Sequence, residues 1–132
     1  MKEGYIKKED RKKILLITDD IRVHSGVAQI GREIVFNTSH KYNWVQMAGA
    51  VEHPDEGKII DLSDEIGKQV PNVHDPHCLL YPTKGYGDIN LLRAVIGREN
   101  PDAIMLITDP RYFAWLFHAE NEIRSKIPIS YL

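Results

Sequence analysis

Residues 19–26 carry the side chains with the clearest capacity for chemistry, and they lie between an apolar run and a stretch with helical spacing. Asp19 and Asp20 directly follow the apolar residues 14–17, and Ser25-Gly26 opens the helical stretch. Unpaired N–H groups at a helix start favour anions, and a glycine there lets a phosphate come close to the backbone. This order of features predicts a nucleotide or nucleotide-sugar site.

Two common phosphate motifs do not fit this stretch. Gly26 and Gly31 have the spacing that opens a P-loop, but Arg32-Glu33 follow where that motif requires Lys-Ser/Thr. No G-x-G-x-x-G follows the first apolar run. An NTPase is therefore excluded, and a dinucleotide-dependent dehydrogenase is disfavoured.

The pair Asp19-Asp20 is also typical of the magnesium site of response-regulator receiver domains. Such domains need a phosphoryl-accepting aspartate after the third strand, a role for which Asp61 is a poor candidate. They also need a lysine after the fifth strand, and none follows Ile129. A capping role is the simpler alternative, because an aspartate after a strand often accepts hydrogen bonds from loop N–H groups.

One histidine, His24, is a candidate for ligand binding, and the others indicate no site. His74 and His77 lie three apart without a third ligand nearby, so we predict no metal site. His24 is different, because it adjoins Ser25-Gly26 in the loop where ligands are expected to bind.

Apolar runs and turn residues alternate in a regular order along the chain. Apolar runs predict strands at 13–18, 44–49, 78–81, 103–107 and from 129 onward, with a further short strand within 58–62. Helices are expected to begin at Ser25, Asp88 and Asp109-Pro110, and close packing on the sheet accounts for Gly31. Residues 64–70 are ambiguous. This pattern predicts an α/β fold, a Rossmann-like open sheet that is mostly parallel, with helices on both faces.

Ligands of open α/β sheets bind outside the carboxyl ends of the strands. Residues 19–26, 84–88 and 108–112 follow predicted strands and should therefore converge there. Arg111 lies in the first turn of its helix, where it can contact an anionic or sugar ligand. The aromatic residues that follow it are expected to lie mostly in the core.

Length, charge and cysteine content set the broad class. The 132 residues suit one domain, and the net charge of −2 gives no support for nucleic-acid binding. A single cysteine, Cys78, excludes an internal disulfide, and no apolar run approaches the length of a membrane span. Because no secretory signal is present, we expect a cytoplasmic protein. Residues 1–12 read as a flexible polar leader and residues 13–132 as the folded domain.

Four segments together resemble the N-terminal Rossmann-like half of GT-B glycosyltransferases, most closely those encoded by bacteriophages. They are DDIRVHSGVAQIGREIV (19–35), HKYNWVQMAGAVEHP (40–54), YPTKGYGDINLLR (81–93) and PDAIMLITDPRYFAWLF (101–117). The resemblance implies transfer of a sugar from a nucleotide-sugar donor to an acceptor hydroxyl, in the host cytoplasm if a phage encodes the chain. It implies no tightly bound cofactor.

The resemblance also implies site residues. The loop next to the donor phosphates matches Ser25, Gly26 and Val27, and the acceptor or sugar contacts match Asp20, His24, Gly85, Tyr86, Asp109, Arg111 and Tyr112. Many relatives carry His-x-His-Asp where this chain has residues 106–109, and only Asp109 matches, so no catalytic residue is assigned.

In that family a second Rossmann-like domain holds the nucleotide, and this sequence does not contain it. The chain ends in a predicted strand, so we expect a fragment or a truncated reading frame that is inactive alone. The alternative hypothesis is a non-catalytic signalling or interaction module of the flavodoxin-like or receiver type.

Overall fold

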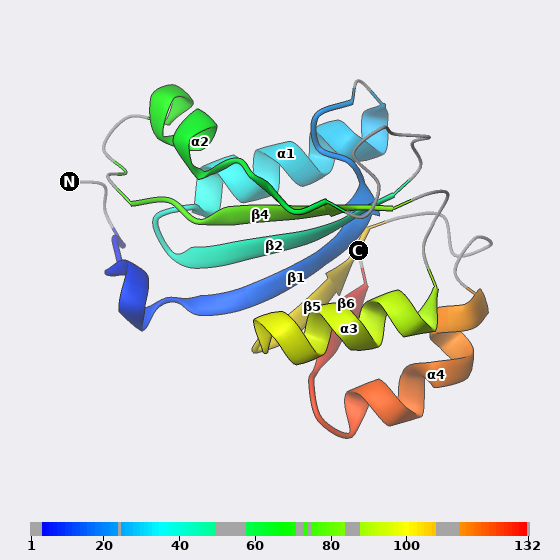
Figure 1. The fold of residues 1–132 in the computed structure, drawn as a ribbon. Coiled ribbons are helices and arrows are strands. Elements are labelled where there is room, and N and C mark those ends of the chain that lie inside the picture. The colour runs from blue at the N-terminus through cyan, green and yellow to red at the C-terminus, as the bar shows by residue number, and fades with distance from the viewer. Residues whose placement is uncertain are drawn as a thin grey trace.

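A computed structural model describes residues 4–23, 25–49, 58–70, 73, 75–83, 88–107 and 114–131. Its centre is a six-stranded sheet in the order β3-β4-β2-β1-β5-β6 (Figure 1). The strands are β1 (Lys12–Asp19), β2 (Tyr42–Gly49), β3 (Ile60–Asp61), β4 (Cys78–Pro82), β5 (Ala103–Leu106) and β6 (Ile129–Tyr131). Only β3 runs antiparallel to its neighbour. The α/β prediction and its mostly parallel open sheet are confirmed.

The strand order places a topological switch beside the central strand. Numbered along the chain, the five parallel strands have the spatial order 3-2-1-4-5. This is the Rossmann order without its last strand, and it differs from the flavodoxin-like order 2-1-3-4-5. The chain moves outward from β1 through β2 to β4, then returns to the other side of β1 with β5. The crevice between β1 and β5 is therefore the expected place for a ligand.

Helices cover both faces of the sheet (Figure 1). The helices are α1 (Gly26–Thr38), α2 (Ser63–Gln69), α3 (Ile89–Glu99) and α4 (Ala114–Arg124), and a short 3₁₀ helix, η1 (Lys8–Asp10), precedes β1. α1 and α2 lie on one face, and α3 and α4 lie on the other. The ambiguous residues 64–70 form most of α2, whose single buried residue is Ile66.

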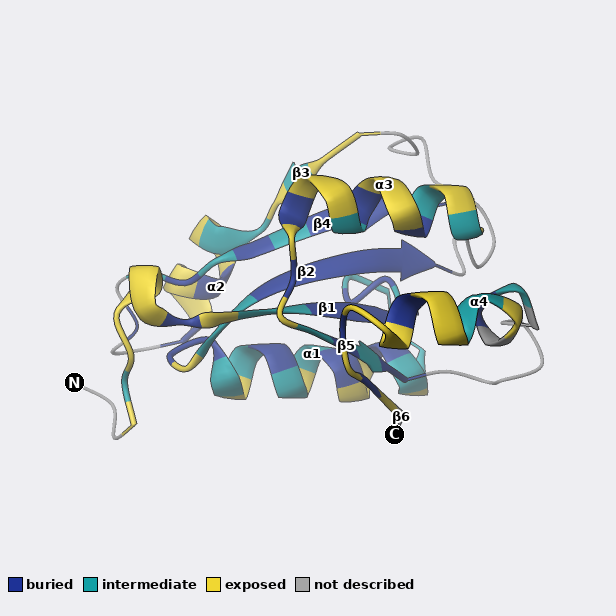
Figure 2. Ribbon diagram, turned by 90° about the horizontal axis from the view of Figure 1, so that it is seen from below, coloured by how far each residue is buried: buried dark blue, intermediate teal, exposed yellow. Residues whose placement is uncertain are grey.

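Successive residues of β1 supply the two cores because side chains alternate across a strand. Leu15 and Ile17 pack with residues of α3 and α4, whereas Leu16 packs with residues of α1 and α2. Figure 2 shows buried residues along the strands and on the sheet-facing sides of the helices. The central strand is thus buried on both faces, as a parallel sheet requires.

Gly31 lets α1 lie close to the sheet. A Cβ atom at this position would lie 3.2 Å from Thr18 Cγ2 and 3.4 Å from Ile21 Cγ2. The close packing predicted for this glycine is confirmed, because no larger residue fits without displacing these neighbours.

Residues 4–11 are mostly exposed, but Tyr5 and Arg11 tie this segment to Asp75, a contact that the flexible leader predicted for 1–12 does not include. The Arg11 side chain is fully buried and donates to Asp75 Oδ1 at 2.6 Å and to the Asp75 carbonyl at 2.7 Å. Its guanidinium lies 5.2 Å from the centre of the Tyr5 ring, and the Tyr5 hydroxyl also donates to Asp75. Burial raises the pKa of Asp75, but the hydrogen bonds from Tyr5 and Arg11 outweigh it and lower the pKa. The polar composition of residues 4–11 does not indicate this contact, because Asp75 lies more than 60 residues further along the chain.

None of the helices in the described ranges combines the length and the apolar character needed to cross a membrane.

Candidate functional site

The loops after β1, β4 and β5 begin side by side at the carboxyl edge of the sheet. The first residue after each strand still donates a backbone hydrogen bond to a neighbouring strand, in the pairs Asp20–Gly49, Thr83–Ala48 and Ile107–Ile17. The three loops therefore start at the same edge of the sheet, and residues 84–87 and 108–112, which were predicted to converge there with 19–26, lie outside the described residues. Six predicted contacts lie outside the described residues: His24, Gly85, Tyr86, Asp109, Arg111 and Tyr112. The described part of the candidate site is therefore the loop that joins β1 to α1, residues 20–25 without His24, here called the β1 loop.

Ser25 is the N-cap of α1, as predicted. Its Oγ accepts a hydrogen bond from the Ala28 N–H at 3.0 Å and donates one to Asp19 Oδ2 at 2.9 Å. A Cβ atom built on Gly26 meets nothing within 4 Å, so the backbone at the start of α1 is open. Val27, the third residue predicted near the donor phosphates, is partly buried and packs against the core under α1 and α2.

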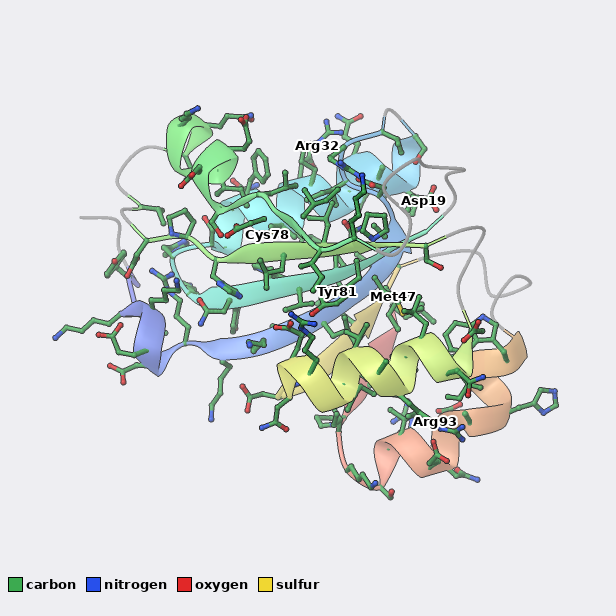
Figure 3. All side chains as sticks on the ribbon, in the orientation of Figure 1. Asp19, Arg32, Met47, Cys78, Tyr81 and Arg93 are labelled. Carbon is green, nitrogen blue, oxygen red and sulfur yellow. The ribbon has the colours of Figure 1, made fainter. Side chains whose placement is uncertain are left out.

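The two aspartates at the end of β1 have different surroundings. The Asp20 side chain is 1% exposed and pairs with the Arg22 guanidinium, with Nη2 to Oδ2 at 2.6 Å. Its Oδ1 also accepts the Arg22 backbone N–H at 2.8 Å. Asp20 therefore accepts a hydrogen bond from a loop N–H group, which is the simpler alternative that the sequence analysis gave for it. Its carboxylate is turned away from solvent. Asp19 is partly exposed at the same edge (Figure 3).

Gln46 and Arg32 hold the β1 loop from two other elements. Gln46 is 1% exposed in β2. Its Nε2 donates to the Asp19 carbonyl at 2.7 Å, and its Oε1 accepts the Ile21 N–H at 3.3 Å. Arg32 of α1 donates to the carbonyls of Ile21 and Val23, both at 2.8 Å. Residues 19–23 are thus held in place by side chains of two other elements.

Neither residue was identified as part of the site from the sequence. Gln46 stands within the apolar stretch 44–48, and a lone amide in a buried strand signals a partner. From the sequence, Arg32 indicates only that the P-loop pattern is broken.

The charges at the start of α1 favour a hydrogen-bond donor over a bare anion. The N–H groups of the first turn attract anions, yet the Asp19 carboxylate already lies against Ser25 there. Arg22 and Arg32 are engaged with Asp20 and with backbone carbonyls. A phosphate at Gly26 would therefore meet a like charge, whereas a hydroxyl group could donate to Asp19.

The described residues hold no group of three or more His, Cys, Asp or Glu side chains arranged as metal ligands. Burial lowers the pKa of His77, which favours its neutral form. Burial likewise raises the pKa of the Cys78 thiol to about 12, so this cysteine stays protonated and unreactive at neutral pH.

Comparison of the chain with models of protein families, with curated proteins and with solved structures gives no match.

Proposed function

We propose that the chain is the acceptor-side domain of a GT-B-type glycosyltransferase of the hexosyltransferase class. The observation that carries the proposal is the accessible Asp19 carboxylate beside the open start of α1, at the switch point of the strand order. Transfer of a sugar needs both features, because the attacking hydroxyl must lose a proton and the departing diphosphate must be stabilised.

In this proposal Asp19 accepts a hydrogen bond from the attacking hydroxyl of the acceptor. Asp19 was not among the residues that the sequence resemblance selected, but it is the accessible member of the pair. Asp20 would then support the loop through Arg22 instead of contacting a sugar. Gly26 leaves room for the donor phosphates, but the Asp19 charge opposes them, so this domain alone would hold them weakly and a second Rossmann-like domain would hold the nucleotide.

Binding of pyrophosphate and of nucleotide diphosphates to the chain tests the proposal. We expect weak binding, on the order of millimolar, with shifts of the backbone amide NMR signals of residues 25–28. Gly26→Val places a branched side chain in the open space and should weaken binding at least fivefold. Gly97→Val in α3 is the matched control, because a Cβ there also meets nothing within 4 Å.

Asp19→Asn tests whether the Asp19 charge opposes binding of an anion at Gly26. It keeps an acceptor for the Ser25 hydroxyl but removes one negative charge, so pyrophosphate affinity should rise roughly fourfold for charges about 5 Å apart in water. Unchanged binding in Gly26→Val, or shifts confined to another part of the chain, would contradict the proposed site.

A further inference from the structure

A second hollow, of about 390 Å³, lies between α3, β4 and residues Lys58 and Ile59, and it reaches Thr83 and Asp88 at the two ends of the loop after β4. Its volume falls in the range of small-molecule sites, which is roughly 300–1,000 Å³. In Figure 2, α3 runs beside β4, and the exposed segment that enters β3 borders the same side.

The hollow has an apolar wall built on the core. Val95 is 1% exposed and Tyr81 is 9% exposed, so their side chains are fixed by packing. Leu91 and Ala94 extend this wall along α3, and Ile59, which is 39% exposed, faces it from the other side. An apolar ligand body would cover Ile59, one of the few large apolar side chains left exposed among the described residues.

The polar groups of this wall leave a net positive charge. Asp88 Oδ1 caps α3 by accepting the Leu91 N–H at 2.8 Å. Glu99, which follows Arg98, accepts the Tyr81 hydroxyl and pairs with Lys13. Lys58 and Arg98 are the two cations of the lining.

Arg98 is the cation available to a ligand. Within the described part of the chain, it has no ion-pair partner, and its side chain is exposed. The arginine on the other side of α3 differs, because Arg93 donates to Glu122 at 2.8 and 3.0 Å. Among the described residues, α3 thus carries one arginine with an ion pair, Arg93, and one without, Arg98, and each lines a different hollow.

We infer that the hollow beside Arg98 binds a small, mostly apolar molecule that carries one anionic group. The apolar body lies on Val95, Ala94 and Ile59, and the carboxylate or phosphate of the ligand accepts hydrogen bonds from Arg98. No residue of the β1 loop, on which the sugar-transfer proposal rests, lines this site.

NMR titration of the whole chain with 2-naphthoate tests the inference, with neutral 2-naphthamide as the matched ligand. We expect naphthoate to shift the amide signals of Ile59, Ala94, Val95 and Arg98 and to bind at least fivefold more tightly than the amide. Arg98→Gln should remove this preference, whereas Arg93→Gln should keep it. Ala94→Leu fills the hollow and should weaken both ligands, and its unchanged far-UV spectrum would show that the fold is retained.

Three results would overturn the inference. They are the absence of saturable shifts at these residues, equal binding of the amide and the acid, and retention of the preference in Arg98→Gln. If Arg93→Gln removed the preference for naphthoate instead, the ligand would bind in the hollow between α3 and α4. Because the lining of this hollow includes no residue of the β1 loop, failure here leaves the sugar-transfer proposal standing.

Discussion

Replacing Gln46 by leucine should destabilise the fold by about 3 kcal/mol. The substitution keeps the size of the side chain but removes the partners of two backbone groups, the Asp19 carbonyl and the Ile21 N–H. A buried polar group left without a partner costs about 1–3 kcal/mol. The short bond to the Asp19 carbonyl, at 2.7 Å, should account for about 2 kcal/mol of the loss. The longer bond from the Ile21 N–H, at 3.3 Å, should add about 1 kcal/mol.

Urea unfolding of the wild type and of Gln46→Leu measures this loss, which corresponds to a fall in Tm of about 10 °C for a domain of this size. Gln69→Leu is the control, because Gln69 is exposed on α2 and should change the free energy of unfolding by less than about 0.5 kcal/mol. Hydrogen exchange should also show faster exchange of the Ile21 amide. A loss below about 1 kcal/mol, or one equal to that of the control, would refute the view that Gln46 holds the β1 loop.

Two further predictions concern α1 and β4. Gly31→Ala should destabilise the fold by about 1 kcal/mol, because the new methyl group meets Thr18 at 3.2 Å and overpacking outweighs the helix propensity of alanine. Gly97→Ala has open space and should be neutral or stabilising in the same urea assay, so an equal response of the two glycines would contradict the packing argument. Burial and the hydrogen bond to Glu99 raise the pKa of Tyr81 from 10 to about 12, so its neutral phenol stabilises the fold below pH 10. This contribution should disappear between pH 10 and 12, and the difference in unfolding free energy between the wild type and Tyr81→Phe should shrink over that range.

Local patterns in the sequence predicted most of the elements correctly. The apolar runs at 13–18 and 103–107 became β1 and β5, because strands of a parallel sheet are buried on both faces and need no alternation. Ser25 and Asp88 were identified as N-caps and accept the backbone bonds that this role requires. Buried strands and N-caps both depend on residues that are close together in the chain, so the sequence alone is enough to predict them.

Contacts between distant residues were decided by the tertiary structure. Arg11 lies in a polar segment that reads as a flexible leader, and only folding brings it to Asp75. α2 has one buried residue, Ile66, so its apolar pattern is too weak to be recognised before the sheet is present.

In the β1 loop, some features follow from the local sequence and others from the tertiary structure. The sequence by itself placed a strand, a polar loop and a helix start in order, since hydrophobic runs and capping residues act locally. It did not distinguish Asp19 from Asp20, because both follow the same strand. The fold turns Asp20 inward to Arg22 and leaves Asp19 accessible beside Ser25, and Gln46 from β2 holds this arrangement. The partners of both carboxylates lie within six residues, but the backbone of the loop that orients them is held by Gln46, which only the assembled sheet brings there.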